Sequence, residues 1–462
     1  MKKLFFTVLV CFNMLGLHAQ VDSTQTLMNL LMQDEFFKAR DYYRAYDKQI
    51  AAAGKQFYKY RMNYLSNNLD SASIYLDDFI TNYIKDSRID NKIIFVNLQV
   101  LLYTEMKDYA KLIDTYDKIE QLIKQPPFDS EEYVEWQKAQ FALMNQFKSD
   151  ARKNLSIPKM CVSRDNKGSK LVKLENDSLI SSVIAMAKFN NIPLKTIFDT
   201  GASIPVIISK QYADKCHFKE IPSPVDSFPL NGSMVRAHQA LIDSIRVGSL
   251  IFTNAVGLVI HDNSILLLPD STLLNEEQKK NYDSVVKSFD AIIGMPLLRS
   301  LGCMQLDWEK REMQLNLKSE VVKKKHDSNI FISKEELYMG LSVNGRSYTG
   351  FVDLGNGHTC IELSSNFYAN NKNYLTLSQL EQKRGIASLA TVNKNIGYKA
   401  VINPRIKYGS KSISLKNEHD CVVSQDVSSV FGKDGQIGLL FFKRMAKKIS
   451  LDFVNMSIDP VN

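Results

Sequence analysis

The hydrophobic pattern of the chain changes near residue 160. Before that point, apolar residues recur every three or four positions, and the clearest example is DYAKLIDTYDKIEQLIKQPP at residues 108–127. Such spacing places the apolar side chains on one face of a helix, and Pro126-Pro127 ends it. After residue 160, short apolar runs alternate with turn residues, which is typical of strands and hairpins. The pattern predicts an α+β multidomain protein, with an all-α region of helical hairpins followed by an all-β region.

The β-rich part contains an internal repeat. NNIPLKTIFDTG at 190–201 and NGRSYTGFVDLG at 344–355 share a hairpin turn, a strand, an apolar pair and then Asp-x-Gly. Downstream, AIIG and GQIG, each followed by a large apolar cluster, continue the match in the same order. Matched order across two half-chains indicates two duplicated lobes.

The repeat makes Asp199 and Asp353 equivalent, and each directly follows an apolar strand. A buried carboxylate is costly unless it is paired or hydrogen-bonded. Each could be an ordinary turn residue that accepts backbone N–H groups, but the duplication favours a functional pair. Two adjacent carboxyls share a proton, so one can take a proton from water while the other donates one to a carbonyl. Asp199 and Asp353 are therefore the predicted catalytic residues.

The stretch Asp-Thr-Gly-Ala-Ser at 199–203 resembles the active loop of the aspartic peptidases, both retropepsin-like and pepsin-like. AIIG and GQIG resemble the segment that braces this loop. The resemblance covers residues from about 165 to 460 and implies two lobes, each lending one Asp to a cleft, with no metal and no cofactor. It implies that the active-site loops contain Thr200, Gly201, Ser203, Leu354 and Gly355, and that a flap hairpin has its tip at Gly232 and Ser233.

The second loop departs from the family pattern. Leu354 and Gly357 stand where the first loop has the hydroxyl residues Thr200 and Ser203. Two functions therefore remain open. The first is an aspartic endopeptidase that hydrolyses peptide bonds with water activated between the two Asp residues. The second is a catalytically weak or inactive peptidase fold that binds peptides or proteins.

The helical region resembles tetratricopeptide-like hairpins, although no repeat motif can be aligned. It predicts either a surface for a protein partner or a scaffold that packs on the next domain. The first residues read MKKLFFTVLVCFNMLGLHAQ, with two lysines, an apolar run and a small residue at Ala19. This is the pattern of a signal peptide, and we expect export to the periplasm, the cell surface or the medium, as in a bacterial protein. The expected domains are the signal peptide at 1–19, the helical domain at 20–158, and the two lobes at 159–322 and 323–462.

Composition and motifs exclude several other classes. The net charge of +8 is modest for 462 residues and the lysines are scattered, so no nucleic-acid partner is expected. No later segment is apolar enough for a membrane span. The chain has neither an HExxH zinc helix nor a GxSxG elbow, which argues against a zinc peptidase and a serine hydrolase. Five widely spaced cysteines remain after the signal peptide, and they show no metal-binding spacing.

Overall fold

The computed structural model describes most of the chain, and it divides into two compact units between Lys159 and Met160. The described residues are 20–166, 168–175, 182–222, 227–230, 233–261, 288–323, 327–357, 360–379, 381–388, 391–409, 411–413, 415, 420–424 and 433–461. The predicted signal peptide at 1–19 lies outside them.

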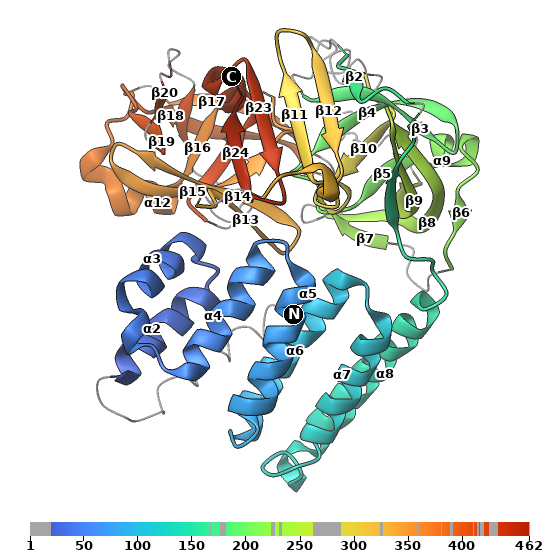
Figure 1. The fold of residues 1–462 in the computed structure, drawn as a ribbon, viewed down its shortest axis with the longest axis vertical. Coiled ribbons are helices and arrows are strands. Elements are labelled where there is room, and N and C mark those ends of the chain that lie inside the picture. The colour runs from blue at the N-terminus through green and yellow to red at the C-terminus, as the bar shows by residue number, and fades with distance from the viewer. Residues whose placement is uncertain are drawn as a thin grey trace. The chain divides into compact units, whose positions relative to one another are not determined.

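The first unit is all-helical, as predicted. Successive helices pack against one another, most clearly α4 with α5, α6 with α7 and α7 with α8 (Figure 1). The helices are α2 (Gln20–Met32), α3 (Phe36–Tyr46), α4 (Ala52–Leu65), α5 (Leu69–Phe79), α6 (Ile89–Met106), α7 (Tyr109–Leu122) and α8 (Val134–Asn154), with short η2 (Asp47–Gln49), η3 (Ile80–Ile84) and η4 (Glu131–Tyr133) turns.

Aromatic residues fill the centre of this unit. The rings of Phe57, Phe79 and Phe95, from α4, α5 and α6, lie 5.0–5.7 Å apart and are almost fully buried. Helix α7 begins where Asp108 accepts the backbone N–H of Lys111, and it ends before the two prolines that were expected to stop it. Burial of one face of each helix supplies most of the stability of such short helices.

The second unit is β-rich, as predicted, and begins with a sheet formed by the first half of the repeat. Its strand order is β1-β9-β5-β10-β4-β3-β8-β6, with β7 paired to β8. The strands are β1 (Cys161–Arg164), β3 (Ile184–Phe189), β4 (Ile192–Asp199), β5 (Val206–Ser209), β6 (Lys219–Glu220), β7 (Ser227–Leu230), β8 (Ser233–Val247), β9 (Leu250–Ile260) and β10 (Ala291–Gly294), with helices α9 (Lys210–Lys215) and α11 (Met295–Leu298).

The second half of the repeat forms a corresponding sheet. Its strand order is β17-β18-β21-β16-β22-β15-β14-β19-β20, with β13 paired to β14. The strands are β13 (Ile330–Ser333), β14 (Glu336–Val343), β15 (Arg346–Asp353), β16 (Ile361–Ser364), β17 (Gln382–Ser388), β18 (Thr391–Ala400), β19 (Ile406–Tyr408), β20 (Lys411–Ile413), β21 (Cys421–Ser424) and β22 (Gly435–Gly438), with α12 (Ser365–Asn371), η7 (Lys372–Tyr374) and α13 (Leu439–Met445).

A third sheet joins the two lobes, in the order β2-β12-β11-β23-β24. Strands β11 (Cys303–Asp307) and β23 (Lys448–Asp452) come from opposite halves of the repeat and pair antiparallel at its centre (Figure 1). The remaining members are β2 (Leu171–Lys173), β12 (Glu312–Asn316) and β24 (Ser457–Pro460), and η6 (Lys318–Glu320) follows β12. One continuous apolar core includes residues of both lobes.

The two predicted hairpin turns are confirmed and are built alike. Asn190 and Asn191 have φ of 44° and 69°, and Asn344 and Gly345 have φ of 49° and 79°, as a two-residue hairpin loop with positive φ requires. The side chain of Asn190 accepts the N–H of Ser244 and donates to a carbonyl oxygen, and that of Asn344 accepts the N–H of Arg405 and donates in the same way. The duplication therefore extends to the hydrogen bonds that fix each turn.

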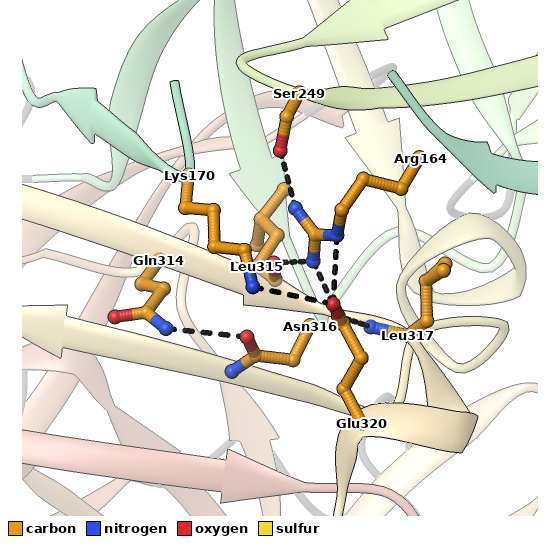
Figure 2. Close-up of polar contacts among 8 residues, drawn as sticks. All are labelled: Arg164, Lys170, Ser249, Gln314, Leu315, Asn316, Leu317 and Glu320. Atoms are coloured by element: carbon orange, nitrogen blue, oxygen red, sulfur yellow. Dashed lines mark hydrogen bonds and ion pairs between the residues drawn. The ribbon is translucent and has the colours of Figure 1, made fainter. Parts of the chain in front are cut away.

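A charged cluster ties the start of the β-rich unit to the end of its first lobe (Figure 2). Arg164 of β1 donates through two nitrogens to Glu320, to the hydroxyl of Ser249 and to the Leu315 carbonyl. Glu320 also accepts the Leu317 N–H at 2.7 Å, and Lys170 lies 3.4 Å away. The donors of Arg164, together with that amide, lower the pKa of Glu320 to about 2.

We expect this cluster to stabilise the fold above pH 4.5. The folded-state pKa of Glu320 lies below the reference value of 4.5, so its contribution is complete above that value and is lost as pH falls toward about 2. Glu320→Gln should therefore lower the melting temperature at pH 7 by about 2–4 °C, equivalent to roughly 1 kcal/mol for a solvent-screened pair, and the difference should shrink below pH 4. The control is Glu309→Gln, because Glu309 pairs with Lys447 while both are well exposed. An equal loss in both variants, measured by calorimetry, would contradict the assignment.

Candidate active site

Asp199 and Asp353 stand at equivalent strand ends. Asp199 is the last residue of β4 and Asp353 the last of β15, and each lies beside a glycine of a neighbouring parallel strand, Gly294 in β10 and Gly438 in β22. These glycines end the AIIG and GQIG segments, which therefore support the two loops. A Cβ on Gly294 would lie 2.1 Å from the Ile204 carbonyl oxygen, so only glycine fits there.

The structure brings the two carboxyls into hydrogen-bond contact, and both residues are half-buried. Asp199 Oδ1 accepts the N–H of Gly201 at 2.7 Å and that of Gly355 at 3.1 Å. Asp353 Oδ1 accepts the N–H of Gly355 at 2.9 Å and that of Asn356 at 3.0 Å. The Gly355 amide is thus shared by both carboxyls and holds them together.

The glycines of the two loops are required by close approach. A Cβ on Gly201 would lie 2.7 Å from Asp353 Oδ1, and a Cβ on Gly355 would lie 2.6 Å from the carboxyl of Asp199. Neither residue is among the glycines with positive φ. Any side chain at these positions would therefore push the carboxyl of the opposite lobe away.

Thr200 connects the loops across the lobes. Its buried hydroxyl donates to the Val352 carbonyl at 2.8 Å and accepts the Leu354 N–H at 3.0 Å. Leu354 has no hydroxyl with which to return the bond, and its side chain is 1% exposed in the apolar core of the unit. The hydrogen bonds between the loops therefore come from the Thr200 hydroxyl alone, and the second loop contributes the apolar packing of Leu354 instead.

The remaining predicted site residues are less central. Ser203 is exposed, and within the described residues no hydrogen bond joins its hydroxyl to Asp199. The expected flap is a β7–β8 hairpin in which Leu230 pairs with Ser233, the first residue of β8. Gly232 lies outside the described residues.

Burial raises the pKa of both carboxyls, and the negative charge of Asp199 raises the pKa of Asp353 further, well above its usual range. The backbone N–H groups act in the opposite direction, because they stabilise the ionised form. Two carboxyls in contact hold one proton between them, and their titration belongs to the pair. The arrangement can accept a proton and donate another at the same place.

Two residues at the site were not predicted from the sequence. The side-chain amide of Gln436, in β22, donates to Asp353 Oδ2 at 2.5 Å. The hydroxyl of Ser182 donates to the Gly355 carbonyl at 2.8 Å. Gln436 occupies the position that Ile292 holds in the first lobe. The replacement of an apolar residue by a polar one in the second copy of AIIG was the sequence feature that could have indicated its role.

Other chemistry finds little support in the described part of the chain. No group of three or more His, Cys, Asp or Glu side chains there could hold a metal ion. The five described cysteines are unbonded, and all except Cys161 are buried. None of the described helices has the length and apolar character needed to cross a membrane.

Comparison with models of protein families gives a match in the first lobe. Residues 185–297 match a family model described as "Aspartyl protease", so the first lobe carries a domain of that family. The chain also has similarity to the crystal structure of a retropepsin-like aspartic protease from Rickettsia conorii, with 20% identity over 34% of this chain and 94% of that one and a TM-score of 0.21. The search of curated proteins gives no match.

Removing one of the two carboxyls should stabilise the unit at neutral pH. Because both carboxyls have raised pKa values, the folded state loses stability as pH rises from about 4 through the folded-state pKa values. Asp199→Asn keeps an acceptor for Gly201 and Gly355 and adds a donor toward Asp353. Its melting temperature at pH 7 should exceed that of the wild type by about 2–4 °C, and the gain should vanish near pH 3. Asp307→Asn is the matched control, since the Asp307 side chain accepts, from the residues that the structure describes, only the turn amide of Lys310. A less stable Asp199→Asn protein at pH 7 would contradict the charge argument.

Introducing a hydroxyl at position 354 should lower both stability and turnover. Leu354→Thr would remove buried methyl groups and bury a hydroxyl in apolar surroundings, at a combined cost of roughly 2–4 kcal/mol. Leu354→Val has nearly the same shape as threonine and isolates the effect of the hydroxyl. Thermal melting and turnover should fall further in Leu354→Thr than in Leu354→Val. A threonine variant that is more active than the wild type and equally stable would show that the missing hydroxyl limits the site.

Proposed function

We propose that the protein is an aspartic endopeptidase whose catalytic pair is Asp199 and Asp353. The observation that carries the proposal is the contact between these two half-buried carboxyls, with the Gly355 amide donating to both. Both residues belong to one chain, so a single molecule contains the complete pair. The aspartyl protease match over residues 185–297 supports the reaction class.

The reaction that this pair supports is direct hydrolysis of a peptide bond. The ionised carboxyl takes a proton from a water molecule while the water oxygen attacks the carbonyl carbon. The protonated carboxyl gives its proton to the carbonyl oxygen, which yields a neutral tetrahedral diol. The diol then collapses: one hydroxyl gives its proton to the carboxyl that had donated to the carbonyl oxygen, the C–N bond breaks, and the leaving nitrogen receives a proton from the carboxyl that first accepted one. No covalent enzyme intermediate forms, and the shared proton is restored.

The substrate of this activity is a peptide or an unfolded protein segment. The β7–β8 hairpin, in which Leu230 pairs with Ser233, is proposed as the flap that closes over it. The apolar N-terminal segment with Ala19 supports the proposal that the protein works outside the cytoplasm. The helical unit is proposed to bind a protein partner or to act as a scaffold.

One observation favours a second candidate function. The one-directional bridge from Thr200 to the second loop leaves that loop without the hydroxyls of the first. A fold with a weakened loop could retain a peptide without cutting it. The alternative is therefore a peptide-binding or protein-binding module with little or no hydrolysis.

Activity measurements on the purified protein separate the two functions. The wild type should cleave members of a diverse peptide library between about pH 3 and 7, and Asp199→Asn and Asp353→Asn should each lose nearly all activity, because the pair acts as one unit. Asp307→Asn should keep wild-type turnover. Peptide retention without cleavage at any pH would favour the binding module. Near-normal turnover of Asp353→Asn would show that the second lobe is not catalytic.

A further inference from the structure

The two lobes differ in what lies beside their active-site carboxyls. In the first lobe, Ile207 of β5 pairs directly with Ile292 of β10. In the second lobe, the equivalent strands β16 and β22 place Glu362 opposite Gln436. Residues directly opposite in an antiparallel pair share a face of the sheet. An apolar pair in one lobe therefore corresponds to a polar pair in the other.

The surroundings of these pairs differ in the same way. Ile207 and Ile292 belong to an apolar cluster with Ile197 of β4. Glu362 and Gln436 are only 1% and 3% exposed, so the second lobe buries two polar side chains where the first buries two aliphatic ones. Burial of polar groups is costly without hydrogen bonds, so retaining them there calls for an explanation.

Gln436 makes a direct contact with the catalytic pair. Its side-chain nitrogen donates to Asp353 Oδ2 at 2.5 Å, while the amides of Gly355 and Asn356 donate to Oδ1. Both oxygens of Asp353 thereby accept hydrogen bonds, which fixes the plane of this carboxyl. The Tyr348 hydroxyl anchors the strands that carry the polar pair, because it lies 3.0 Å from the Glu362 carbonyl oxygen and 3.2 Å from that of Gln436.

We propose that Gln436 is a positioning residue that orients Asp353 and stabilises its ionised form, in place of the hydroxyl that the second loop lacks. The proposal rests on the proposed function, since it assigns Gln436 a role in the same reaction. A neutral donor on the second oxygen holds the carboxyl without adding charge. Among the described residues, Asp199 of β4 hydrogen-bonds Asp353, Glu362 of β16 pairs with Gln436 across the strands, and the Tyr348 hydroxyl of β15 donates to the Gln436 carbonyl. The tests below leave these three ionisable groups unchanged.

Removing the donor should alter both the rate and the pH profile. Gln436→Met keeps the length of the side chain but donates no hydrogen bond. We expect kcat to fall at least about tenfold with KM within a factor of about two, because the lost bond orients a reacting group rather than the substrate. Both limbs of the pH–kcat profile should move to higher pH by about one unit, since an N–H donor favours the carboxylate. Ile292→Met, at the equivalent position of the first lobe, should leave both measurements unchanged.

Gln436→Glu provides a second test that preserves size. A glutamic acid can donate to Asp353 only when it is protonated, so this variant should approach wild-type kcat at the acid end and lose activity steeply as pH rises. A purely structural role for Gln436 would lower the melting temperature and leave the shape of the pH–kcat profile unchanged. Wild-type kcat and an unchanged pH profile in Gln436→Met or Gln436→Glu would overturn the proposal.

A measurement that does not depend on catalysis, the melting temperature as a function of pH, tests the role of Gln436 separately from the proposed function. A wild type that hydrolyses no peptide would contradict the proposed endopeptidase. The pH dependence of the melting temperature would still report the two carboxyls, because their raised pKa values make stability fall as pH rises. In Gln436→Met this fall should extend to higher pH than in the wild type. An unchanged pH dependence would overturn the role of Gln436 whether or not the wild type is active.

Discussion

The close approach of two carboxyls from different lobes is the constraint on which the rest of the β-rich unit depends. Two acids in contact repel each other when both are ionised, and partial burial raises the free energy of each charge. The Gly355 amide donates to both, and the Thr200 hydroxyl joins the Leu354 amide to the Val352 carbonyl. Glycine at 201 and 355 is then required, because each backbone runs directly against the carboxyl of the other lobe.

The remainder of the unit acts as a support for that contact. The parallel neighbours of the two Asp residues end in Gly294 and Gly438, and the strands behind them are buried on all sides. The sheet formed by β11 and β23 joins the two halves by main-chain hydrogen bonds, so the lobes share one core. A rigid support of this kind holds catalytic groups within a fraction of an ångström, which flexible loops alone do not do.

The two copies have diverged in how they hold their carboxyls. The first loop carries Thr200, which bridges to the other lobe, and its supporting strands contribute an aliphatic pair. The second loop has a buried leucine in place of that threonine, and its supporting strands contribute Gln436, which reaches Asp353. A side chain from the supporting strand β22 therefore supplies a hydrogen bond that the second loop itself does not supply. A duplicated fold permits such a replacement, because the active-site loop and its supporting strand are neighbours in space although they are far apart in sequence.

The amino-acid sequence by itself determined the helical and β-rich regions, the hairpin turns and the duplication, because these depend on local spacing and on backbone preferences. Asn190-Asn191 and Asn344-Gly345 are residue pairs that tolerate the positive φ of a two-residue hairpin loop, and all four residues adopt it. This preference depends only on the residues of the turn itself. The repeat likewise makes Asp199 and Asp353 equivalent, because both copies carry Asp-x-Gly directly after an apolar strand. Only the tertiary structure decided which groups surround the pair. The contact from Gln436 to Asp353 spans 83 residues. No periodicity or motif predicts such a hydrogen bond, because it forms only when strands from distant segments lie side by side.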